Sequence, residues 1–593
     1  MTRRLPTFRF PARTLPALLV HTAKRLPDKP FLRFLEPGRG QAAPRVLSFA
    51  AFARGVGRGA AFLRSAGVTP GERVLLLAEN SPEWQLLALG TQLLRAEPAA
   101  LFASLGAAPA QAIALRVRPR AVFVSTAEQW EKLRPVAAEL AQAGLRAVVC
   151  AAGVDPAGLP EGVTWTALPA ATGEGAADLA EGELEALAAA VGEEDPFLLL
   201  FTSGTTGRPK GVRLPQRSIV HAIEGGHVST GRSEADEGLH LLPFAHVAGQ
   251  DQFMIALAQG HGLIMISGRG ELERALALGP TYLFSVPLVY ERMKEGVEKK
   301  LAALPPPLRA FAHAALEAGA RVRVDGSRSG ADRLLTHVAD RLVGKALRAR
   351  LGGRMQGVFS GVAPASPALF RFFEGVGLPF VELYGLSETA GLVSSNVFAG
   401  PRRAGTVGLL SADHDVRFSD EGELLVRGPL LLSGFLEPED AEGAYTPEGY
   451  FRTGDLAHLD DDGMLRVQGR KKSLLVLSTG KKLSPEPIEQ AISDTPPFQG
   501  AVLLGEGKPY VTAVVFVVKE ELQRLRAQGK DAAAELLPQV HAALHAFSDY
   551  ERPKRLAVFP GAPSDYPELV TPTFKVKRAA VMAWLGPAAA GLY

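Results

Sequence analysis

The chain has 593 residues, of which 47% are hydrophobic and 21% are charged. This balance is typical of a globular protein and excludes a disordered or fibrous one, and the length predicts several packed units instead of one core. The formal net charge is only +3, from 65 basic and 62 acidic residues, so the composition does not favour nucleic-acid binding. A single cysteine, Cys150, excludes an intrachain disulfide and a cysteine metal cluster, and it fits a reducing, cytoplasmic compartment.

The first thirty residues are basic, but their apolar stretch is interrupted by Pro16 and followed by His21 and Lys24. This pattern predicts an amphipathic opening helix and not a signal peptide. No apolar run elsewhere reaches the roughly 18 residues that a membrane-spanning helix needs. Peripheral attachment to a membrane surface therefore stays open.

Short apolar runs then alternate with longer helical patterns. We expect strands at 74–78, 121–124 and 146–150, and helices at 84–94 and 128–143. Strands that alternate with helices predict an α/β fold with largely parallel sheets. A stretch rich in Gly, Ala and Glu at 171–195 is expected to be a surface connection that contains one helix.

The sequence TSGTTGRPKG at 202–211 directly follows the apolar run 196–201. Its glycines permit positive φ angles, so successive backbone N–H groups can turn toward one anion. Because hydroxyl groups and a lysine add further donors and a charge, the loop is predicted to bind phosphate. It is not a Walker A loop, since no G-x-x-x-x-G-K-[ST] string occurs in the chain. The predicted phosphate-binding residues are Thr202, Ser203, Gly204, Thr205, Thr206, Gly207 and Lys210.

This loop resembles the signature loop of the adenylate-forming, or AMP-binding, enzymes: acyl-CoA synthetases, luciferases and peptide-synthetase adenylation domains. Further segments resemble motifs of that superfamily in the same order, across nearly the whole chain. They are LPFAHVAG at 242–249, SGVAP at 360–364, YGLSET at 384–389, YFRTGDL at 450–456, GRKK at 469–472 and TPTFKVKR at 571–578.

The resemblance implies a nucleotide site built from these segments. The ring of Tyr384 would stack on adenine, while Glu388 and Thr202 would hold the Mg²⁺ that bridges the ATP phosphates. Asp455 would accept hydrogen bonds from the ribose hydroxyls, beside Arg470. The nucleotide contacts implied outside the phosphate loop are Gly361, Val362, Ala363, Glu382, Leu383, Tyr384, Gly385, Ser387, Asp455 and Arg470.

The resemblance also implies two domains. The N-terminal domain, 1–469, would combine α/β subdomains that have mostly parallel sheets with a β-barrel-like subdomain, and 470–472 would form a hinge with Lys472 at its pivot. A small, mobile α+β domain would follow at 473–593, with Gly480 near the pantetheine of coenzyme A. Its last motif aligns Lys575 with the family's catalytic lysine. Since Phe574 replaces the usual glycine there, Lys577 remains an alternative.

The acid that is activated is indicated by a basic insertion rich in Ala and Leu at 291–355. It resembles an insertion of the long-chain fatty acyl-CoA synthetases, and the alternative is a helical hairpin with no role in specificity. The acyl-pocket residues implied by resemblance are Val247, Gln250, Val286, Gly385 and Leu386.

The activity implied is ATP-dependent activation of a carboxylic acid, in first place a long-chain fatty acid, to acyl-AMP and pyrophosphate, followed by transfer to coenzyme A. The catalytic residues would be Thr202, His246, Glu388 and Lys575, with ATP, Mg²⁺ and coenzyme A as cofactors or co-substrates. Expected partners are small molecules and not nucleic acid, and the chain could be a monomer or a homodimer. Two alternatives stay open: an acyl-AMP ligase that loads a carrier-protein thiol, and a nucleotide-binding homologue without turnover.

Overall fold

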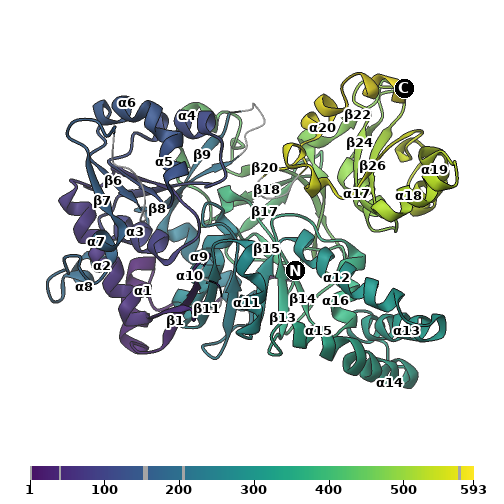
Figure 1. The fold of residues 1–593 in the computed structure, drawn as a ribbon, viewed down its shortest axis with the longest axis horizontal. Coiled ribbons are helices and arrows are strands. Elements are labelled where there is room, and N and C mark those ends of the chain that lie inside the picture. The colour runs from purple at the N-terminus through teal and green to yellow at the C-terminus, as the bar shows by residue number, and fades with distance from the viewer. Residues whose placement is uncertain (1–2, 39, 41, 151–157, 203–207, 572–575) are drawn as a thin grey trace.

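The protein has a large N-terminal domain and a small C-terminal domain. Its structure, a computed structural model, describes residues 3–38, 40, 42–150, 158–202, 208–571 and 576–593. Within these ranges, the buried apolar residues of the first domain lie between Leu5 and Leu465, and those of the second lie between Leu475 and Leu592. Figure 1 shows the C-terminal elements at the upper right, beside the larger domain. The α/β fold with a large and a small domain is confirmed.

The first sheet has eight strands in the order β19-β9-β8-β4-β3-β5-β6-β7. The strands from β8 to β7 pair in parallel, whereas β9 pairs antiparallel with β8 and β19. Apolar runs that are buried on both faces form its centre, as parallel sheets require. The strands are β3 (Arg73–Leu77), β4 (Glu97–Leu101), β5 (Ala121–Val124), β6 (Ala147–Cys150), β7 (Thr164–Ala167), β8 (Pro196–Thr202), β9 (Lys210–Pro215) and β19 (Gly434–Phe435).

Three helices cover one face of this sheet. α4 (Ala107–Val117) is followed by α5 (Ala127–Leu133) and α6 (Ala137–Gln142). The single helix expected at 128–143 is therefore divided by a 3-10 turn that contains Pro135. Proline has no N–H group to donate and its ring obstructs the preceding turn, so the α-helical pattern stops there.

The second sheet has nine strands in the order β16-β15-β14-β13-β12-β10-β11-β1-β2. Its central strands, from β14 to β1, are parallel, and both edges are antiparallel. The strands are β1 (Pro30–Leu35), β2 (Arg45–Ser48), β10 (Glu237–His240), β11 (Gly262–Ile266), β12 (Tyr282–Ser285), β13 (Gly357–Ser360), β14 (Phe380–Tyr384), β15 (Ser394–Ser395) and β16 (Leu409–Leu410).

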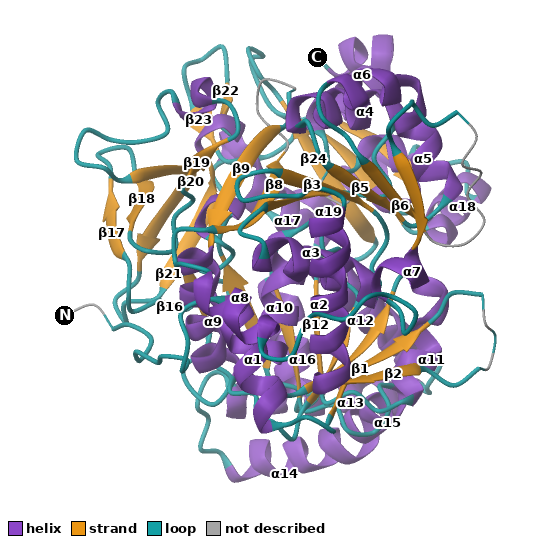
Figure 2. Cartoon of the chain, turned by 90° about the vertical axis from the view of Figure 1, so that its left-hand side faces the viewer, coloured by secondary structure: helices purple, strands orange, loops and turns teal. Residues whose placement is uncertain are grey.

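Helices fill the space between the two sheets, as Figure 2 shows for α2, α3 and α10. Their starts follow local sequence signals. Ser48 caps α2 by accepting a hydrogen bond from the Ala51 N–H, and Ser81 caps α3 ahead of Pro82. The helices that join this layer are α1 (Leu15–Arg25), α2 (Phe49–Ser65), α3 (Pro82–Leu93), α9 (Gln216–Thr230) and α10 (Val247–Gln259), while α7 (Leu168–Thr172) and α8 (Glu183–Ala190) lie at its margin.

The insertion at 291–355 is almost entirely helical. α13 and α14 pack against each other as a hairpin, and α13 also packs on α16, so that one face of α13 is buried and the other is exposed. Across the described residues, no helix is both long and apolar enough to cross a membrane. The helices of this region are α11 (Leu272–Ala277), α12 (Pro287–Ala302), α13 (Pro306–Arg323), α14 (Gly330–Ala339), α15 (Lys345–Arg350) and α16 (Pro367–Gly375).

The expected β-barrel-like part is a four-stranded antiparallel sheet of β17 (Asp415–Phe418), β18 (Glu423–Arg427), β20 (Phe451–Leu459) and β21 (Leu465–Arg470). A short turn after β21 leads into the C-terminal domain. The described residues of that domain form a hairpin, a three-stranded sheet and four α-helices: β22 (Leu475–Val476), β23 (Lys482–Leu483), β24 (Phe498–Leu504), β25 (Thr512–Val517), β26 (Leu556–Pro560), α17 (Pro485–Ser493), α18 (Lys519–Ala527), α19 (Ala532–Ala543) and α20 (Arg578–Leu585).

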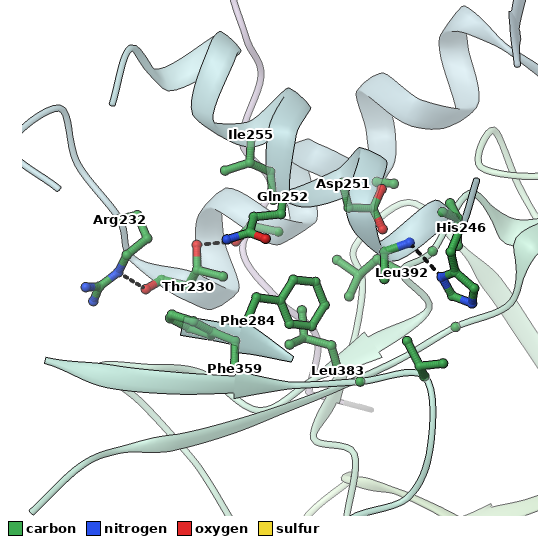
Figure 3. A pocket seen from close by; sticks show the side chains of 18 of the residues that line it. Thr230, Arg232, His246, Asp251, Gln252, Ile255, Phe284, Phe359, Leu383 and Leu392 are labelled. Atoms are coloured by element: carbon green, nitrogen blue, oxygen red, sulfur yellow. Dashed lines mark hydrogen bonds between the residues drawn. The ribbon is translucent and has the colours of Figure 1, made fainter. Parts of the chain in front are cut away.

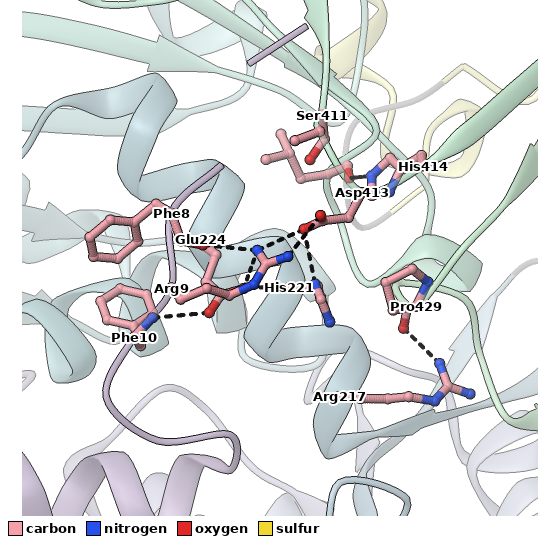
Figure 4. A network of polar contacts seen from close by, with 12 residues as sticks. Phe8, Arg9, Phe10, Arg217, His221, Glu224, Ser411, Asp413, His414 and Pro429 are labelled. Carbon is pink, nitrogen blue, oxygen red and sulfur yellow. Dashed lines mark hydrogen bonds and ion pairs between the residues drawn. The ribbon is translucent and has the colours of Figure 1, made fainter. Parts of the chain in front are cut away.

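A polar network fixes the segment before α1 to the rest of the domain (Figure 4). The Glu224 carboxylate on α9, only 2% exposed, accepts hydrogen bonds from Arg9, Arg13 and the Phe10 N–H. Arg9 also forms two hydrogen bonds of 2.8 Å with Asp413. Side-chain atoms of Glu224, Asp413 and His221 that could bind a metal ion lie within 4.8 Å of one another. Arg9 pairs with both carboxylates and Arg13 with Glu224, so the arginines already neutralise these charges.

Replacing Arg9 and Arg13 together with alanine should lower the stability of the N-terminal domain by about 3–5 kcal/mol, because the buried Glu224 charge would lose its cationic partners. Differential scanning calorimetry would report this as a lower midpoint of the first transition. Arg25→Ala is the matched control, since it removes a more exposed pair with Glu234. Equal shifts in the two proteins would contradict a stabilising role for the Glu224 network.

Candidate functional site

The predicted phosphate loop connects two strands of the first sheet. β8 ends at Thr202 and β9 begins at Lys210, and these two residues are directly opposite in the antiparallel pair. The five residues that the sequence singled out between them, Ser203, Gly204, Thr205, Thr206 and Gly207, lie outside the described residues. The structure therefore gives the position of the loop's two ends, with Thr202 half-buried.

Later segments hold the second end of the loop. The Lys210 ammonium donates to the Asp440 carbonyl at 2.9 Å and lies over the Phe435 ring. Arg116 donates to the Pro209 carbonyl at 2.9 Å and makes two bonds of 2.5 Å with Glu437. These contacts fix the position of the strand that carries the lysine, before any phosphate binds.

Three predicted nucleotide-binding residues are in direct contact. The Asp455 carboxylate, which is 3% exposed, accepts a hydrogen bond of 2.6 Å from the Tyr384 hydroxyl and a charged one of 2.9 Å from Arg470 Nε. Asp455 and Arg470 are opposite one another on β20 and β21, and Tyr384 ends β14. Burial and the neighbouring Asp455 charge raise the pKa of Tyr384, so its hydroxyl remains a donor.

The predicted metal ligand Glu388 lies in the turn that follows β14. Its backbone carbonyl accepts a hydrogen bond of 2.9 Å from the Leu432 N–H, which fixes this turn against the loop before β19. Burial raises the pKa of Glu388, and the charges of Arg470 and Lys210 oppose that rise. A half-buried carboxylate close to these two cations provides oxygen ligands of the kind that Mg²⁺ prefers, and the turn contacts β9, which starts at Lys210.

The predicted adenine-binding segment follows β13. Val362 has a φ angle of +73°, an unusual conformation for a branched residue, and the Ala365 N–H donates to the Glu382 carboxyl at 2.9 Å. Burial raises the pKa of Glu382 to about 8. The structure thus places Gly361, Val362 and Ala363 beside Glu382 and Leu383, at the carboxyl ends of adjacent parallel strands, where α/β sheets bind ligands.

A cavity of about 710 Å³, part of it open to solvent, adjoins this cluster (Figure 3). The cavity lies between α9 and α10 on one side and β12, β13 and the end of β14 on the other, and its surface is mostly apolar. Its lining includes Ala222, Thr230, Arg232, His246, Val247, Asp251, Gln252, Ile255, Phe284, Phe359, Val362, Leu383, Gly385 and Leu392.

His246, the N-cap residue of α10, lines one end of this cavity (Figure 3). Its Nδ1 accepts a hydrogen bond of 3.1 Å from the Ala248 N–H, which leaves Nε2 as the nitrogen that carries the proton when the ring is neutral. Val362 and Gly385 line the cavity and also belong to the predicted nucleotide contacts. The apolar cavity and the nucleotide cluster therefore share residues.

Of the five residues proposed to line an acyl pocket, two line the cavity and three do not. Val247 and Gly385 line the cavity, whereas Gln250, Val286 and Leu386 are not among its lining residues. Gln250 is buried elsewhere, where its amide donates to the Phe244 carbonyl at 2.6 Å and accepts from Gln85. Sequence reasoning missed Asp251 and Ile255, although a helical repeat of four residues from Val247 would have found both.

The remaining predicted residues belong to the C-terminal domain. Gly480 lies in the exposed turn between β22 and β23 with a φ angle of +80°. Arg578 is described and pairs with Glu489 at 2.5 Å, and Lys577 is exposed at the start of α20. Lys575, the predicted catalytic lysine, lies outside the described residues. No described residue of 291–355 lines the cavity.

The chain belongs to the AMP-binding enzyme family. The family's model matches residues 19–436, and the model of the AMP-binding enzyme C-terminal domain matches residues 472–586. These matches cover the cavity, the segment with Tyr384 and Glu388, and most of the small domain, whereas Asp455 and Arg470 lie between them. The sequence resemblance to the adenylate-forming enzymes is thus confirmed.

Among individual proteins, the chain is similar to the long-chain-fatty-acid–CoA ligase FadD15 of Mycobacterium tuberculosis. The two are 32% identical over 548 residues, which cover 88% of this chain and 87% of the relative. The long-chain-fatty-acid–CoA ligase heimdall of Drosophila melanogaster is 29% identical over 526 residues, which cover 85% of this chain and 76% of that protein.

Solved structures share the fold. ATP-bound MatB from Rhodopseudomonas palustris superimposes with a TM-score of 0.69 at 21% identity, covering 96% of this chain and 99% of the other. The anthranilate CoA ligase AuaEII, in complex with anthranoyl-AMP, gives a TM-score of 0.73 at 17% identity. The match covers 97% of this chain and 98% of the other. At these identities the likeness supports the fold alone.

Proposed function

We propose that this enzyme activates a long-chain fatty acid with ATP, forming acyl-AMP and pyrophosphate, and then transfers the acyl group to coenzyme A. The observation that carries the proposal is the apolar cavity, which shares Val362 and Gly385 with the predicted nucleotide contacts. The names of the relatives, long-chain-fatty-acid–CoA ligases at 32% and 29% identity, support the choice of acid.

In the first half-reaction, a carboxylate oxygen of the acid bonds to the α-phosphorus of ATP, and the bond from that phosphorus to the pyrophosphate oxygen breaks. The protein contributes mainly position and charge to such a transfer. We assign the ribose hydroxyls to Asp455 and Arg470, adenine to Tyr384 and the 361–363 segment, and the phosphates to the 202–207 loop and Lys210. We assign the acid's carboxylate to the end of the cavity that His246 lines, beside the nucleotide cluster.

Magnesium fits the same proposal. Glu388 and Thr202 would hold it, since both provide oxygen ligands close to the ends of the phosphate loop. When bound, Mg²⁺ offsets negative charge on the triphosphate. Lys575 would reach the carboxylate and α-phosphate oxygens from the C-terminal domain and stabilise the charge that develops there.

In the second half-reaction, the thiol of coenzyme A attacks the acyl carbon and AMP leaves. We propose that the small domain, 473–593, rotates about 470–472 between the two steps, so that the turn at Gly480 approaches the pantetheine. The short turn Lys471–Ser473 after β21 supports this position of the hinge. Hinge motion of this kind is a common way to complete a catalytic site.

Replacing Lys472 with proline should slow thioester formation more than adenylate formation, because proline fixes φ at the pivot and restricts rotation. The measurement is single-turnover kinetics of each half-reaction, with pyrophosphate release for the first and acyl-CoA formed from supplied acyl-AMP for the second. Lys472→Ala is the matched control, since it removes the side chain but leaves the backbone free. Equal slowing of both steps by the proline variant would contradict the hinge assignment.

The experiment that tests the proposed function is AMP release from ATP and Mg²⁺ with carboxylic acids from acetate to oleate, each with and without coenzyme A. We expect a coenzyme A-dependent maximum at long chains. Adenylate formation without coenzyme A turnover would favour a ligase that loads a carrier-protein thiol. No AMP release with any acid would contradict the proposal and favour a nucleotide-binding homologue without turnover.

For location we propose the cytoplasm, with peripheral attachment to anionic membranes through the insertion. Leu304, just before α13, and Leu308 and Phe311, in its first turns, are 38%, 55% and 43% exposed, within a segment rich in arginine and lysine. Exposed apolar groups beside basic residues favour such surfaces. Co-sedimentation with vesicles that contain anionic lipid should fall when Leu308 and Phe311 are replaced with serine. Unchanged co-sedimentation would contradict attachment through this segment.

A further inference from the structure

The apolar cavity contains one acidic side chain, Asp251 on α10. Figure 3 shows its carboxyl group directed toward Leu392, among the side chains that line the cavity. Asp251 Oδ1 is buried and has no hydrogen-bond partner within the described part of the chain. A buried polar group without a partner is rare in proteins and requires an explanation.

Other polar side chains of the cavity are satisfied within the protein. The Gln252 amide donates to the Leu239 carbonyl at 2.9 Å and pairs with His240 at 3.0 Å, while Thr230 donates to the Gly226 carbonyl at 2.7 Å. Arg232 donates to the Thr230 carbonyl and to Asp236. Asp251 therefore differs from these neighbours, because its carboxyl group is available to a bound molecule.

The wall opposite Asp251 is shaped around its carboxyl group. Gly391 has a φ angle of +102°, and a Cβ atom at that position would lie 1.9 Å from Asp251 Oδ2. Only glycine permits this approach, so the backbone fixes the carboxyl group from one side. Its other oxygen, Oδ1, is the one without a partner.

The helix determines how deep Asp251 lies. It is one turn beyond Val247, and Ile255 is one turn further, so the three residues succeed one another along the cavity at intervals of about 6 Å. His246 and Gly385 mark the end beside the nucleotide cluster, and Thr230 and Arg232 line the other end. With C–C bonds of about 1.5 Å, Asp251 would meet an extended acyl chain roughly four to six carbons from its carboxyl carbon.

We propose that Asp251 is a specificity-determining residue that exchanges a hydrogen bond with a hydroxyl group on the acyl chain, so that the preferred acid is a hydroxy fatty acid. This proposal rests on the proposed function and specifies its substrate class. Burial raises the pKa of Asp251 well above its usual value and so favours the protonated form, which can both donate and accept a hydrogen bond. An unsubstituted chain would leave Oδ1 unpaired, and a site built for a hydrogen bond rejects substrates that lack it.

The test uses the full-length enzyme with ATP, Mg²⁺, coenzyme A, hexadecanoic acid and a series of monohydroxyhexadecanoic acids that carry the hydroxyl at carbons 2 to 12. We expect kcat/KM to pass through a maximum at one interior position, about tenfold or more above hexadecanoic acid. Asp251→Leu should remove the maximum and raise kcat/KM for hexadecanoic acid. Asp251→Asn, which keeps the shape and a hydrogen-bonding group, should retain a maximum.

Ile255→Leu is the matched control, because it changes the shape of the same cavity one turn away but no hydrogen-bonding group. Ile255→Leu should change kcat/KM for plain and hydroxy acids by similar factors and leave the position of the maximum unchanged. A flat profile in the wild-type enzyme, or a maximum that persists in Asp251→Leu, would overturn the proposal.

Binding measurements separate this proposal from the proposed function. Isothermal titration of the same acids to the wild type and Asp251→Leu requires no turnover. Tighter binding of one hydroxy acid by the wild type alone would support the role of Asp251 even if no acid released AMP, whereas equal affinities for plain and hydroxy acids would overturn it.

Discussion

Replacing Lys575 with alanine should lower the rate of acyl-adenylate formation by on the order of a hundredfold or more. Thioester formation from supplied acyl-AMP should be largely retained. The reason is that the lysine would stabilise charge on the carboxylate and α-phosphate oxygens, which is needed only while the first bond forms. Pyrophosphate release measures the first half-reaction, and acyl-CoA formed from acyl-AMP measures the second.

Lys577→Ala provides the control for this experiment. Lys577 is exposed at the start of α20, two residues further along the same motif, and its replacement should leave both half-reactions nearly unchanged. If Lys577→Ala lowered the rate of adenylate formation more than Lys575→Ala, the catalytic role would belong to Lys577. Equal loss of both half-reactions in Lys575→Ala would contradict a role confined to adenylation.

Replacing Asp455 with alanine should lower kcat/KM for ATP by about a hundredfold, because ribose would lose a charged acceptor. Arg470 would also lose its partner, and so would the Tyr384 hydroxyl. KM for the fatty acid should change much less, since Asp455 is not among the cavity-lining residues. Initial rates over a matrix of ATP and acid concentrations give both constants.

Asp462→Ala is the matched control for Asp455→Ala. Asp462 lies in the turn between β20 and β21, where it pairs with Arg403 and is half exposed. Its removal should leave kcat/KM for ATP close to that of the wild type. A similar loss in both variants would assign the effect of Asp455 to the stability of the sheet and not to the nucleotide.

Much of the fold could be predicted because buried parallel strands and amphipathic helices have distinct sequence patterns. The runs at β3, β5 and β6 were found to within one residue at either end. The helix expected at 128–143 was predicted too long, because the effect of Pro135 within the pattern was overlooked. A proline inside a helical pattern therefore allows the end of the helix to be predicted from the sequence.

The structure brings several of the predicted site residues together, but their contacts were not predictable from the sequence. Asp455 and Arg470 were expected together at the ribose and Tyr384 at the adenine, and only the fold shows that the Asp455 carboxylate contacts both other side chains. The cavity was predicted less well, because Gln250 turns into the core while Asp251, its neighbour, faces the cavity. A helix distributes adjacent residues over different faces, so the identity of a motif does not say which of its side chains a ligand meets.

Arg470 takes part in two features of the structure. Its side chain pairs with Asp455, and its backbone ends β21 immediately before the turn at Lys471–Ser473. One residue therefore connects the proposed ribose site to the proposed hinge. Binding linkage is reciprocal, so a nucleotide that favours one orientation of the small domain is itself bound more tightly in that orientation. ATP and acyl-AMP, which would occupy the site before and after the first half-reaction, would then bias this equilibrium differently, and conversion of one into the other would give the two half-reactions a direction.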